Sequence, residues 1–147
     1  GSDRGNFKFI QEEIKKNRLE KLITTIPFAT NEEIILFYNN VFGVVMPTTG
    51  GPTNLPLYEA FFFKKPIFYT KNLLDDEAVK DAIIEIDIND PKDFYNKLLN
   101  LDKIDLEKIK SYGYEYYINT CSSEVFKKNY TSILNEFKYA MTRWKIK

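Results

Sequence analysis

The chain has 147 residues, of which 44% are hydrophobic and 16% aromatic, so it is long and apolar enough for one folded domain with its own core. Its 21 Lys and Arg residues balance 21 Asp and Glu residues, which gives no electrostatic drive toward nucleic acid, and its apolar runs fall short of the roughly 18 residues that a membrane-spanning helix needs. The absence of histidine excludes Ser-His-Asp catalysis and histidine-ligated metals, and the single cysteine, Cys121, excludes an internal disulfide and fits a reducing compartment.

The first part of the chain reads as helix, strand and helix. Residues 7–18 carry apolar side chains at helical spacing, with charged residues on the opposite face. Residues 22–26 are rich in Ile and Thr and predict a β-strand. Thr30 and Glu33 have the spacing of a capping box, which predicts a second helix from there to about Asn40.

The stretch at residues 41–70 is the part around which the fold is organised. Residues 41–46 predict a buried strand, and a turn rich in Gly and Pro follows it. A helix is expected over residues 53–64, and residues 66–70 predict a second apolar strand. Because a helix connects the two strands, we expect them to be parallel.

The turn in this stretch is suited to an anionic ligand. Gly50 and Gly51 let a ligand approach the backbone closely, and Thr53 or Asn54 starts a helix whose first N–H groups point outward. The helix dipole favours a phosphate there, at the carboxyl end of a parallel strand. Glu59 follows about one helical turn later and is placed to accept hydrogen bonds from sugar hydroxyls. The alternative is a plain turn with a capped helix, in which Glu59 is only a carboxylate near a helix N-terminus.

The rest of the chain is mostly helical. The acidic residues Asp75, Asp76 and Glu77 are interpreted as a solvated helix start, in preference to a metal site, because acidic side chains favour the first turn of a helix. An apolar stripe at helical spacing runs along the last helix from Phe126 to Trp144. The predicted elements are a short helix at 75–80, a strand at 82–87, helices at 91–101 and 106–118, and a final helix that opens near residue 121.

From Pro47 to Phe61 the sequence reads P-T-T-G-G-P-T-N-L-P-L-Y-E-A-F. This stretch resembles the donor-binding motif of the family-4 (group 1) retaining glycosyltransferases, which have the GT-B fold. It is closest to the variant P-T-x-x-G-P-T-N-x-P-x-x-E-A-F of enzymes that build capsular and other surface polysaccharides. The resemblance extends over nearly the whole chain. It implies a Rossmann-like parallel sheet flanked by helices, as part of the C-terminal, nucleotide-sugar-binding domain of a two-domain enzyme.

The resemblance also implies roles for individual residues. The Glu that matches Glu59 binds the ribose hydroxyls of the nucleotide in this family, and the loop amides that match Thr53, Asn54 and Leu55 hold the distal phosphate. The loop that contains Phe28 would face the nucleotide base, and a plain strand–helix turn explains that loop equally well. Neither a metal nor a convincing general base is implied. The predicted donor-binding residues are Thr49, Gly50, Gly51, Thr53, Asn54, Leu55, Glu59 and Phe28.

Two positions depart from the family pattern. The commoner pattern has a first glutamate at the position of Gly51, and that glutamate takes part in binding the donor. Lys64 stands where the family usually has the glycine that ends the helix. If Lys64 takes a left-handed backbone conformation, the cost is roughly 1 kcal/mol.

The predicted strands correspond to strands three to six of the family's sheet. Strands one and two, the Arg/Lys pair that clamps the diphosphate, and the acceptor-binding N-terminal domain have no counterpart. We therefore expect one partial domain over residues 1–147, with about four parallel strands in the order 3-4-5-6 and C-terminal helices from about residue 91. An open apolar sheet edge would favour pairing with a second copy in a homodimer.

By resemblance, the chain is expected to bind a UDP- or GDP-linked sugar as substrate, without a separate cofactor. The sugar would be transferred to a glycan or glycolipid acceptor held by the N-terminal domain, in the cytoplasm or at the inner membrane face, with no signal peptide or transmembrane segment. The chain alone is expected to be inactive. One alternative is a non-catalytic nucleotide- or protein-binding module, which the missing clamp favours. A nucleotide-sugar epimerase is a weaker alternative because histidine is absent.

Overall fold

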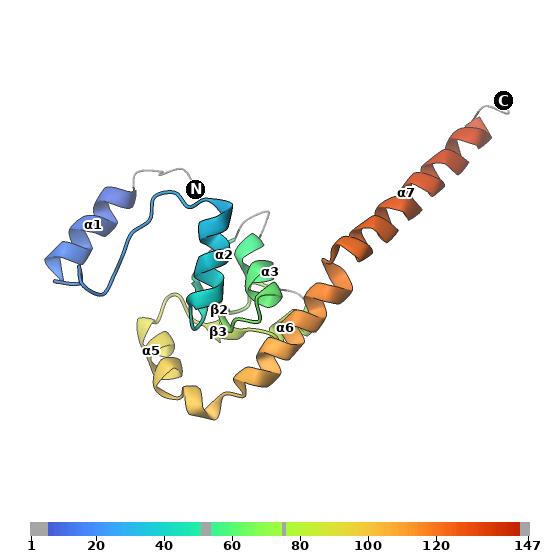
Figure 1. Cartoon of the computed structure of the whole chain (residues 1–147). Coiled ribbons are helices and arrows are strands. Elements are labelled where there is room, and N and C mark those ends of the chain that lie inside the picture. The colour runs from blue at the N-terminus through green and yellow to red at the C-terminus, as the bar shows by residue number, and fades with distance from the viewer. Residues whose placement is uncertain (1–5, 51–53, 75, 145–147) are drawn as a thin grey trace. The chain divides into compact units, whose positions relative to one another are not determined.

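The computed structural model describes residues 6–50, 54–74 and 76–144 (Figure 1). The chain forms two compact units that divide between Asn39 and Asn40. The first unit contains helix α1, Asn6–Lys16, and all but the last residue of helix α2, Asn31–Asn40. The sheet and the remaining helices belong to the second unit.

The capping box that opens α2 is confirmed. The Thr30 N–H donates to a Glu33 carboxylate oxygen at 2.8 Å, and the Glu33 N–H donates to Thr30 Oγ1 at 3.3 Å. Each side chain therefore satisfies a backbone donor that the helix itself leaves without a partner. The start of α2 is thus decided by four consecutive residues.

The prediction of a strand at residues 22–26 is wrong. This segment has no strand in the structure and takes no part in the sheet, and Leu22 is 81% exposed. A β-rich composition produces a strand only where a neighbouring strand supplies hydrogen bonds and a surface to pack on. Residues 22–26 find no such neighbour, so the expected order 3-4-5-6 is not formed.

The described part of the second unit is mixed α/β with a small parallel sheet of three strands, where about four were expected. The strand order is β1-β2-β3, and both pairs are parallel, as the helical connections predicted. Val45 pairs with Phe68, and Tyr69 pairs with Glu85. The central strand is therefore β2, and all four of its residues are buried. The strands are β1, Val44–Met46; β2, Ile67–Thr70; and β3, Ile84–Ile86.

One face of the sheet packs against the later helices. Phe68, Ile84 and Ile86 form a buried cluster, and the ring of Phe94 packs edge-on against Phe68 at 5.2 Å between centroids. Leu101, Ile104, Leu106 and Ile109 complete this part of the core. These residues come from helix α5, Pro91–Leu99; the short 3-10 helix η1, Leu101–Lys103; helix α6, Leu106–Thr120; and the segments between them.

Helix α3, Leu55–Phe62, connects β1 to β2. Its residues Leu57, Ala60 and Phe61 are buried. Because side chains alternate along a strand, Tyr69 points to the face opposite Phe68. Asn54 and Tyr58, at the start of α3, lie close enough to Tyr69 to influence the pKa of its hydroxyl. This places the beginning of α3 over the Tyr69 face of the sheet.

The contact between α3 and α6 is close. A Cβ atom added to Gly113 would lie 2.5 Å from Cδ1 of Phe61, so only glycine fits against that ring. Lys64 lies two residues after the end of α3, and its φ of 52° is in the left-handed region. The Lys64 Nζ lies 4.2 Å from the centroid of the Tyr114 ring, which is a favourable cation–π position.

A short helix, α4, Glu77–Lys80, lies in the connection from β2 to β3. Asp76 caps it by accepting a hydrogen bond from the Ala78 N–H at 3.0 Å, and it also accepts one from the Tyr116 hydroxyl at 3.0 Å. The interpretation of this acidic stretch as a helix start is confirmed for the residues described. Asp75 lies outside them.

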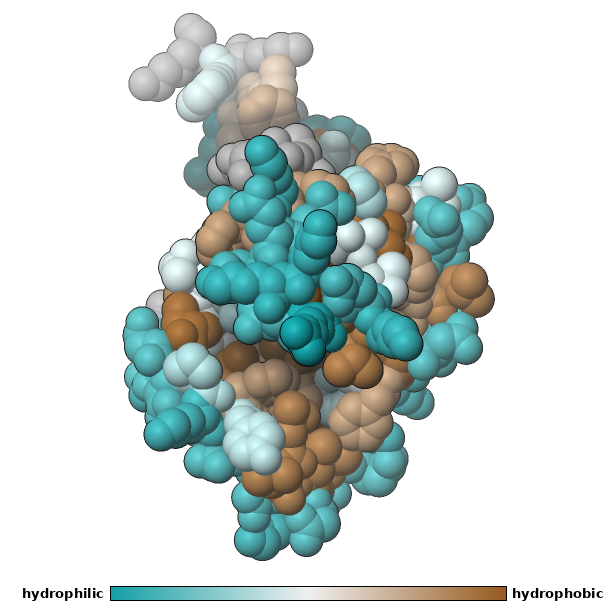
Figure 2. Space-filling view, turned by 90° about the vertical axis from the view of Figure 1, so that its left-hand side faces the viewer, coloured by the Kyte–Doolittle hydropathy of each residue, from teal (hydrophilic) through white to brown (hydrophobic). Residues whose placement is uncertain are grey.

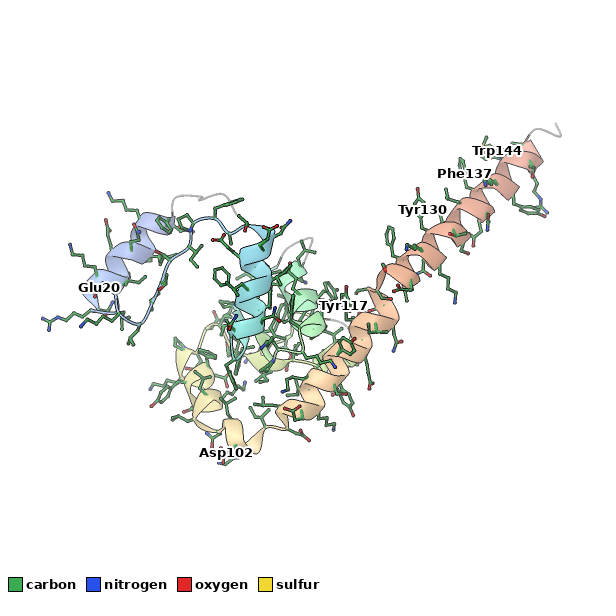
Figure 3. All side chains as sticks on the ribbon, in the orientation of Figure 1. Glu20, Asp102, Tyr117, Tyr130, Phe137 and Trp144 are labelled. Atoms are coloured by element: carbon green, nitrogen blue, oxygen red, sulfur yellow. The ribbon has the colours of Figure 1, made fainter. Side chains whose placement is uncertain are left out.

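The last helix, α7, Ser123–Trp144, has no buried residue. Tyr130, Phe137 and Trp144 lie along one side of it (Figure 3), and Trp144 is 80% exposed. Exposed hydrophobic side chains also reach the surface on the face drawn in Figure 2. Within the part of the chain that the structure describes, no helix is both long and apolar enough to cross a membrane.

Candidate functional site

The loop after β1 lies at the carboxyl end of the parallel sheet. The Thr70 hydroxyl, at the end of β2, donates to the backbone oxygen of Thr48 at 2.6 Å and ties the loop to the central strand. The Gly50 N–H donates to Thr48 Oγ1 at 3.3 Å. Gly50 has a φ of 141°, which an L-residue with a side chain rarely adopts. The loop therefore carries Thr49 and Gly50 at its exposed surface.

The capping residue of α3, Asn54, does not cap the helix with its side chain. Its backbone oxygen accepts from the Leu57 N–H at 2.9 Å, and Pro56 in the first turn has no N–H to offer. Among the described residues, no side chain therefore accepts a hydrogen bond at the positive end of the helix dipole, and such an arrangement favours an anion.

The Asn54 side chain lies instead near a buried hydroxyl. Among the described residues, neither Asn54 Oδ1 nor Tyr69 Oη has a hydrogen-bond partner, and Tyr69 is 0% exposed. Burial raises the pKa of Tyr69, the neighbouring Tyr58 also raises it, and the Asn54 carboxamide acts in the opposite direction. The Tyr69 hydroxyl thus stays protonated beside the capping residue of α3.

Two further tyrosines and one carboxylate extend this polar group. Burial raises the pKa of Tyr58, and Cys121 and Asp76 raise it further. Burial and the hydrogen bond to Asp76 raise the pKa of Tyr116 to about 12. The tyrosines are therefore neutral near pH 7 and act as hydrogen-bonding groups, with the Asp76 carboxylate as a neighbour of both Tyr58 and Tyr116.

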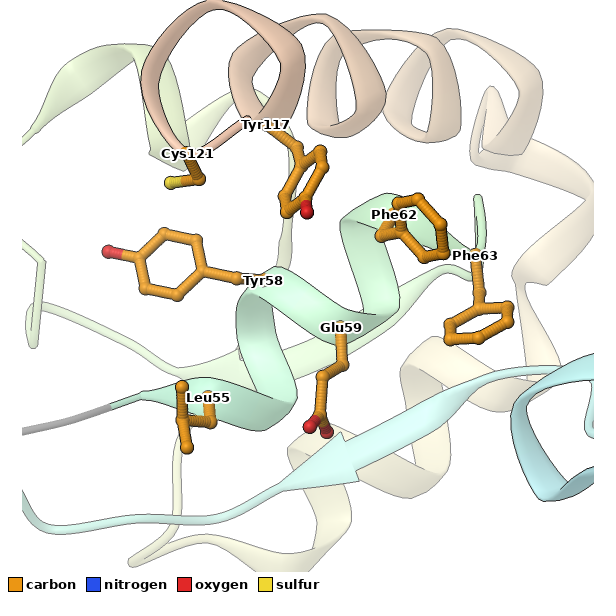
Figure 4. A pocket seen from close by; sticks show the side chains of 7 residues that line it. All are labelled: Leu55, Tyr58, Glu59, Phe62, Phe63, Tyr117 and Cys121. Atoms are coloured by element: carbon orange, nitrogen blue, oxygen red, sulfur yellow. The ribbon is translucent and has the colours of Figure 1, made fainter. Parts of the chain in front are cut away.

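Glu59 stands one helical turn into α3. It lines a pocket of about 340 Å³ between α3 and the end of α6, shown in Figure 4. Tyr58 and Tyr117 lie on the same side as Cys121, whereas the Glu59 carboxylate points away from Tyr117 and Cys121 (Figure 4). The carboxylate therefore lies at the rim and leaves the interior apolar. The lining residues are Leu55, Tyr58, Glu59, Phe62, Phe63, Tyr117 and Cys121.

The structure brings most of the predicted donor-binding residues into one region of the second unit. Thr49 and Gly50 belong to the loop after β1, and Asn54, Leu55 and Glu59 belong to α3 and its cap. Phe28 belongs to the first unit, where it is 76% exposed. Gly51 and Thr53 lie outside the residues that the structure describes.

Sequence reasoning missed Tyr69. The signal was present, because Tyr69 lies in the apolar strand Ile-Phe-Tyr-Thr. A tyrosine that is buried in such a strand usually needs a hydrogen-bond partner for its hydroxyl. Its proximity to Asn54 could not be read from the sequence, because the residues are separated by a helix and a turn. As for metals, the described residues contain no group of three or more Cys, Asp or Glu placed to hold an ion.

A second polar cluster lies at the carboxyl ends of β2 and β3. Lys71 Nζ and Asp87 Oδ2 are 2.6 Å apart. The Asp93 carboxylate accepts from the Asp87 N–H at 2.8 Å and from Lys97 Nζ at 2.8 Å. The Asp87 carboxylate accepts from the Asn89 N–H at 2.9 Å, so each of the two carboxylates has one cation and one backbone donor as neighbours.

These ion pairs predict a loss of stability in acid. The hydrogen bond from Lys71 lowers the pKa of Asp87, and the hydrogen bond from Lys97 lowers the pKa of Asp93. Both carboxylates therefore stabilise the fold above their unfolded pKa of about 4, and this contribution is lost as the pH falls through the lower folded values. We expect the free energy of unfolding to decrease as the pH is lowered from about 5 toward 2.

Denaturant unfolding at several pH values measures this decrease. Asp93→Asn should make the acid loss shallower, because it removes one of the two titrating groups. The exposed Asp102→Asn is the control and should leave the slope as it is in the wild type. Equal slopes in the wild type and Asp93→Asn would show that this ion pair does not contribute.

No protein-family model matches this chain, and none of the curated proteins with which it was compared matches it either.

Proposed function

We propose that this chain is the nucleotide-sugar-binding portion of a glycosyltransferase that transfers a sugar to a surface polysaccharide or glycolipid acceptor. The observation that carries the proposal is the start of α3. This helix begins after the carboxyl end of a parallel strand, its capping residue Asn54 makes no side-chain capping bond, and Glu59 follows one turn later. Open α/β sheets bind nucleotides in this position.

The proposed chemistry divides between the loop and the helix. Backbone N–H groups at Asn54 and Leu55, with the dipole of α3, would hold the distal phosphate of a UDP- or GDP-sugar. Glu59 would accept hydrogen bonds from the ribose hydroxyls. The same N–H groups would stabilise the negative charge that develops on the diphosphate as it leaves. This transition-state stabilisation would accelerate the reaction without a general base. Retention of the anomeric configuration is part of the proposal through the sequence resemblance alone.

Two surfaces support a protein that works with a further domain. Among the described residues β1 pairs only with β2, so its other edge is open to additional strands. Helix α7 has exposed Tyr130, Phe137 and Trp144 at intervals of seven residues, and such apolar stripes usually pack against protein. A Rossmann-like GT-B domain that holds the donor, joined to an acceptor-binding domain, accounts for both. In that arrangement the chain by itself binds donor weakly and transfers nothing.

Helix α7 also favours a second function. The exposed apolar side of α7 is also what a non-catalytic nucleotide- or protein-binding module would present to its partner. The two functions differ at Glu59, because only the donor-binding function requires this carboxylate. Nucleotide binding that ignores Glu59 would therefore support the module.

Calorimetric titration with UDP, GDP and ADP, on the wild type and on Glu59→Ala, tests the proposal. We expect one nucleotide to bind and Glu59→Ala to weaken it by about 1–3 kcal/mol, or roughly 5- to 150-fold in Kd, because a charged hydrogen-bond acceptor is lost. Glu136→Ala, on the exposed surface of α7, is the matched control and should bind like the wild type. Equal affinity in the wild type and Glu59→Ala would contradict the donor site.

A further inference from the structure

Helix α7 carries an apolar stripe that the described part of the chain leaves exposed. Its six side chains are each between 41% and 80% exposed, and the helix has no buried residue. At 3.6 residues per turn they fall within about a quarter of the helix circumference and extend over roughly 27 Å. Three of them, at intervals of seven residues, are labelled in Figure 3. The stripe consists of Phe126, Tyr130, Ile133, Phe137, Met141 and Trp144.

The charges of the chain are distributed unevenly, and positive charge gathers around this stripe. Residues 123–147 contain six Lys and Arg residues and two Glu residues, a net charge of +4, whereas residues 1–122 contain the other 15 basic and 19 acidic residues, a net charge of −4. By helical spacing, Lys127 and Lys138 flank the stripe on its Met141 side, and Arg143 and Glu136 flank it on the other side. An anionic surface would therefore attract this end of the chain and repel the rest.

A bilayer with anionic lipids fits this combination better than a second copy of the helix. Two copies packed stripe against stripe would bring two segments of net charge +4 together. At a bilayer surface, apolar side chains enter the boundary between headgroups and acyl chains while lysine ammonium groups extend to the lipid phosphates. Tyr130 and Trp144 suit that depth, because each ring has an apolar body and a polar atom that stays hydrated. The charged groups on the opposite face keep the helix axis in the plane of the surface.

We propose that α7 is a membrane-binding helix, whose apolar stripe inserts into the headgroup region of a bilayer containing anionic phospholipids and whose lysines bind the lipid phosphates. The stripe alone would suit a protein neighbour as well, and the charges around it are what favour lipid. This inference goes beyond the proposed function and does not depend on the donor site. With α7 on lipid, the open edge of β1 remains as the surface for a further domain.

The fluorescence of Trp144 tests this proposal directly. Trp144 is the only tryptophan in the sequence and stands at one end of the stripe, where it is 80% exposed. The full chain is titrated with vesicles of equimolar phosphatidylglycerol and phosphatidylcholine, and with vesicles of phosphatidylcholine alone. We expect the emission to shift to shorter wavelengths and the chain to float with the anionic vesicles. Binding to phosphatidylcholine alone should be weaker, and added salt should weaken binding to the anionic vesicles.

Phe137→Ser tests the apolar part of the interaction. Phe137 lies near the middle of the stripe, so its loss should lower partitioning into both kinds of vesicle by about tenfold. Its side chain is 60% exposed, so the fold of the sheet does not depend on it. Tyr95→Ser, at a position of α5 that is 59% exposed, is the matched control and should bind like the wild type.

The double variant Lys127→Gln/Lys138→Gln tests the charged part. It should bind the anionic vesicles about 30-fold more weakly, because two lysines near the surface are lost, and should bind phosphatidylcholine like the wild type. Lys92→Gln/Lys103→Gln removes two exposed lysines outside α7 and is the matched control. Equal binding of the wild type and Lys127→Gln/Lys138→Gln to anionic vesicles would overturn the recognition of lipid phosphates.

The remaining outcomes separate lipid from protein as the occupant of the stripe. If neither kind of vesicle shifts the Trp144 emission, the proposal is overturned. If the emission shifts with protein concentration alone and the chain sediments as a dimer, a second copy covers the stripe and the proposal is again overturned. Glu59→Ala should bind vesicles like the wild type, so a failure of the donor site leaves the membrane-binding helix in place, and the reverse also holds.

Discussion

Phe61→Ala should lower the free energy of unfolding of the second unit by about 3–5 kcal/mol, the usual cost of removing a buried phenylalanine ring. Phe61 is 2% exposed and lies where α3 meets α6. Its ring packs edge-on against Tyr58 and Tyr116, at 6.4 Å and 6.1 Å between centroids, and against the backbone at Gly113. Few neighbours can collapse into the space, because the ring is held by two other rings and a helix.

Chemical denaturation followed by circular dichroism measures this loss. Phe62→Ala is the matched control, because Phe62 is the next residue of the same helix and is 48% exposed. We expect it to cost about 1 kcal/mol, since much of its side chain already meets water. Equal losses in the two variants would show that Phe61 does not hold α3 against α6.

Gly113→Leu should destabilise the protein by about 2 kcal/mol, although it places a good helix former in the middle of α6. The added Cβ alone would lie 2.5 Å from Phe61 Cδ1, a distance that real Cβ atoms essentially never show. Leucine gains roughly 0.8 kcal/mol over glycine in helix propensity, so the clash has to exceed that gain. Ser111→Leu, two residues away on the exposed side of α6, should change stability by less than about 0.5 kcal/mol.

The double variant tests whether the two residues act through one contact. With the ring removed, the introduced leucine side chain has room, so Phe61→Ala/Gly113→Leu should be more stable than Phe61→Ala alone. The double variant should lose clearly less unfolding free energy than the sum of the two single losses. Additive losses would mean that the two positions do not share this space.

The proposed donor site depends on this packing as well as on its own residues. Asn54, Leu55 and Glu59 are carried by α3, and α3 is held in place by Phe61 against α6. A partly folded variant would therefore lose nucleotide binding for a structural reason. Glu59→Ala is informative because it changes a single polar group and leaves the Phe61 contact intact.

Local signals in the sequence predicted most of the helices. The capping box of Thr30 and Glu33 opens α2, and Asp90, which accepts from the Lys92 N–H at 3.1 Å, starts α5 beside its proline. The helical connection between β1 and β2 predicted that these strands are parallel. Such features depend on residues within about one helical turn of each other, so they can be read from the chain itself.

The sequence by itself thus determined most of the helices, the parallel connection and the position of the turn that leads into α3. Only the tertiary structure decided that residues 22–26 do not join the sheet, because a strand depends on a neighbour that composition cannot supply. It also placed Tyr69 beside Asn54 and fitted Gly113 against Phe61. These relations join residues that are distant along the chain, and they arise from packing in three dimensions, which no local pattern records.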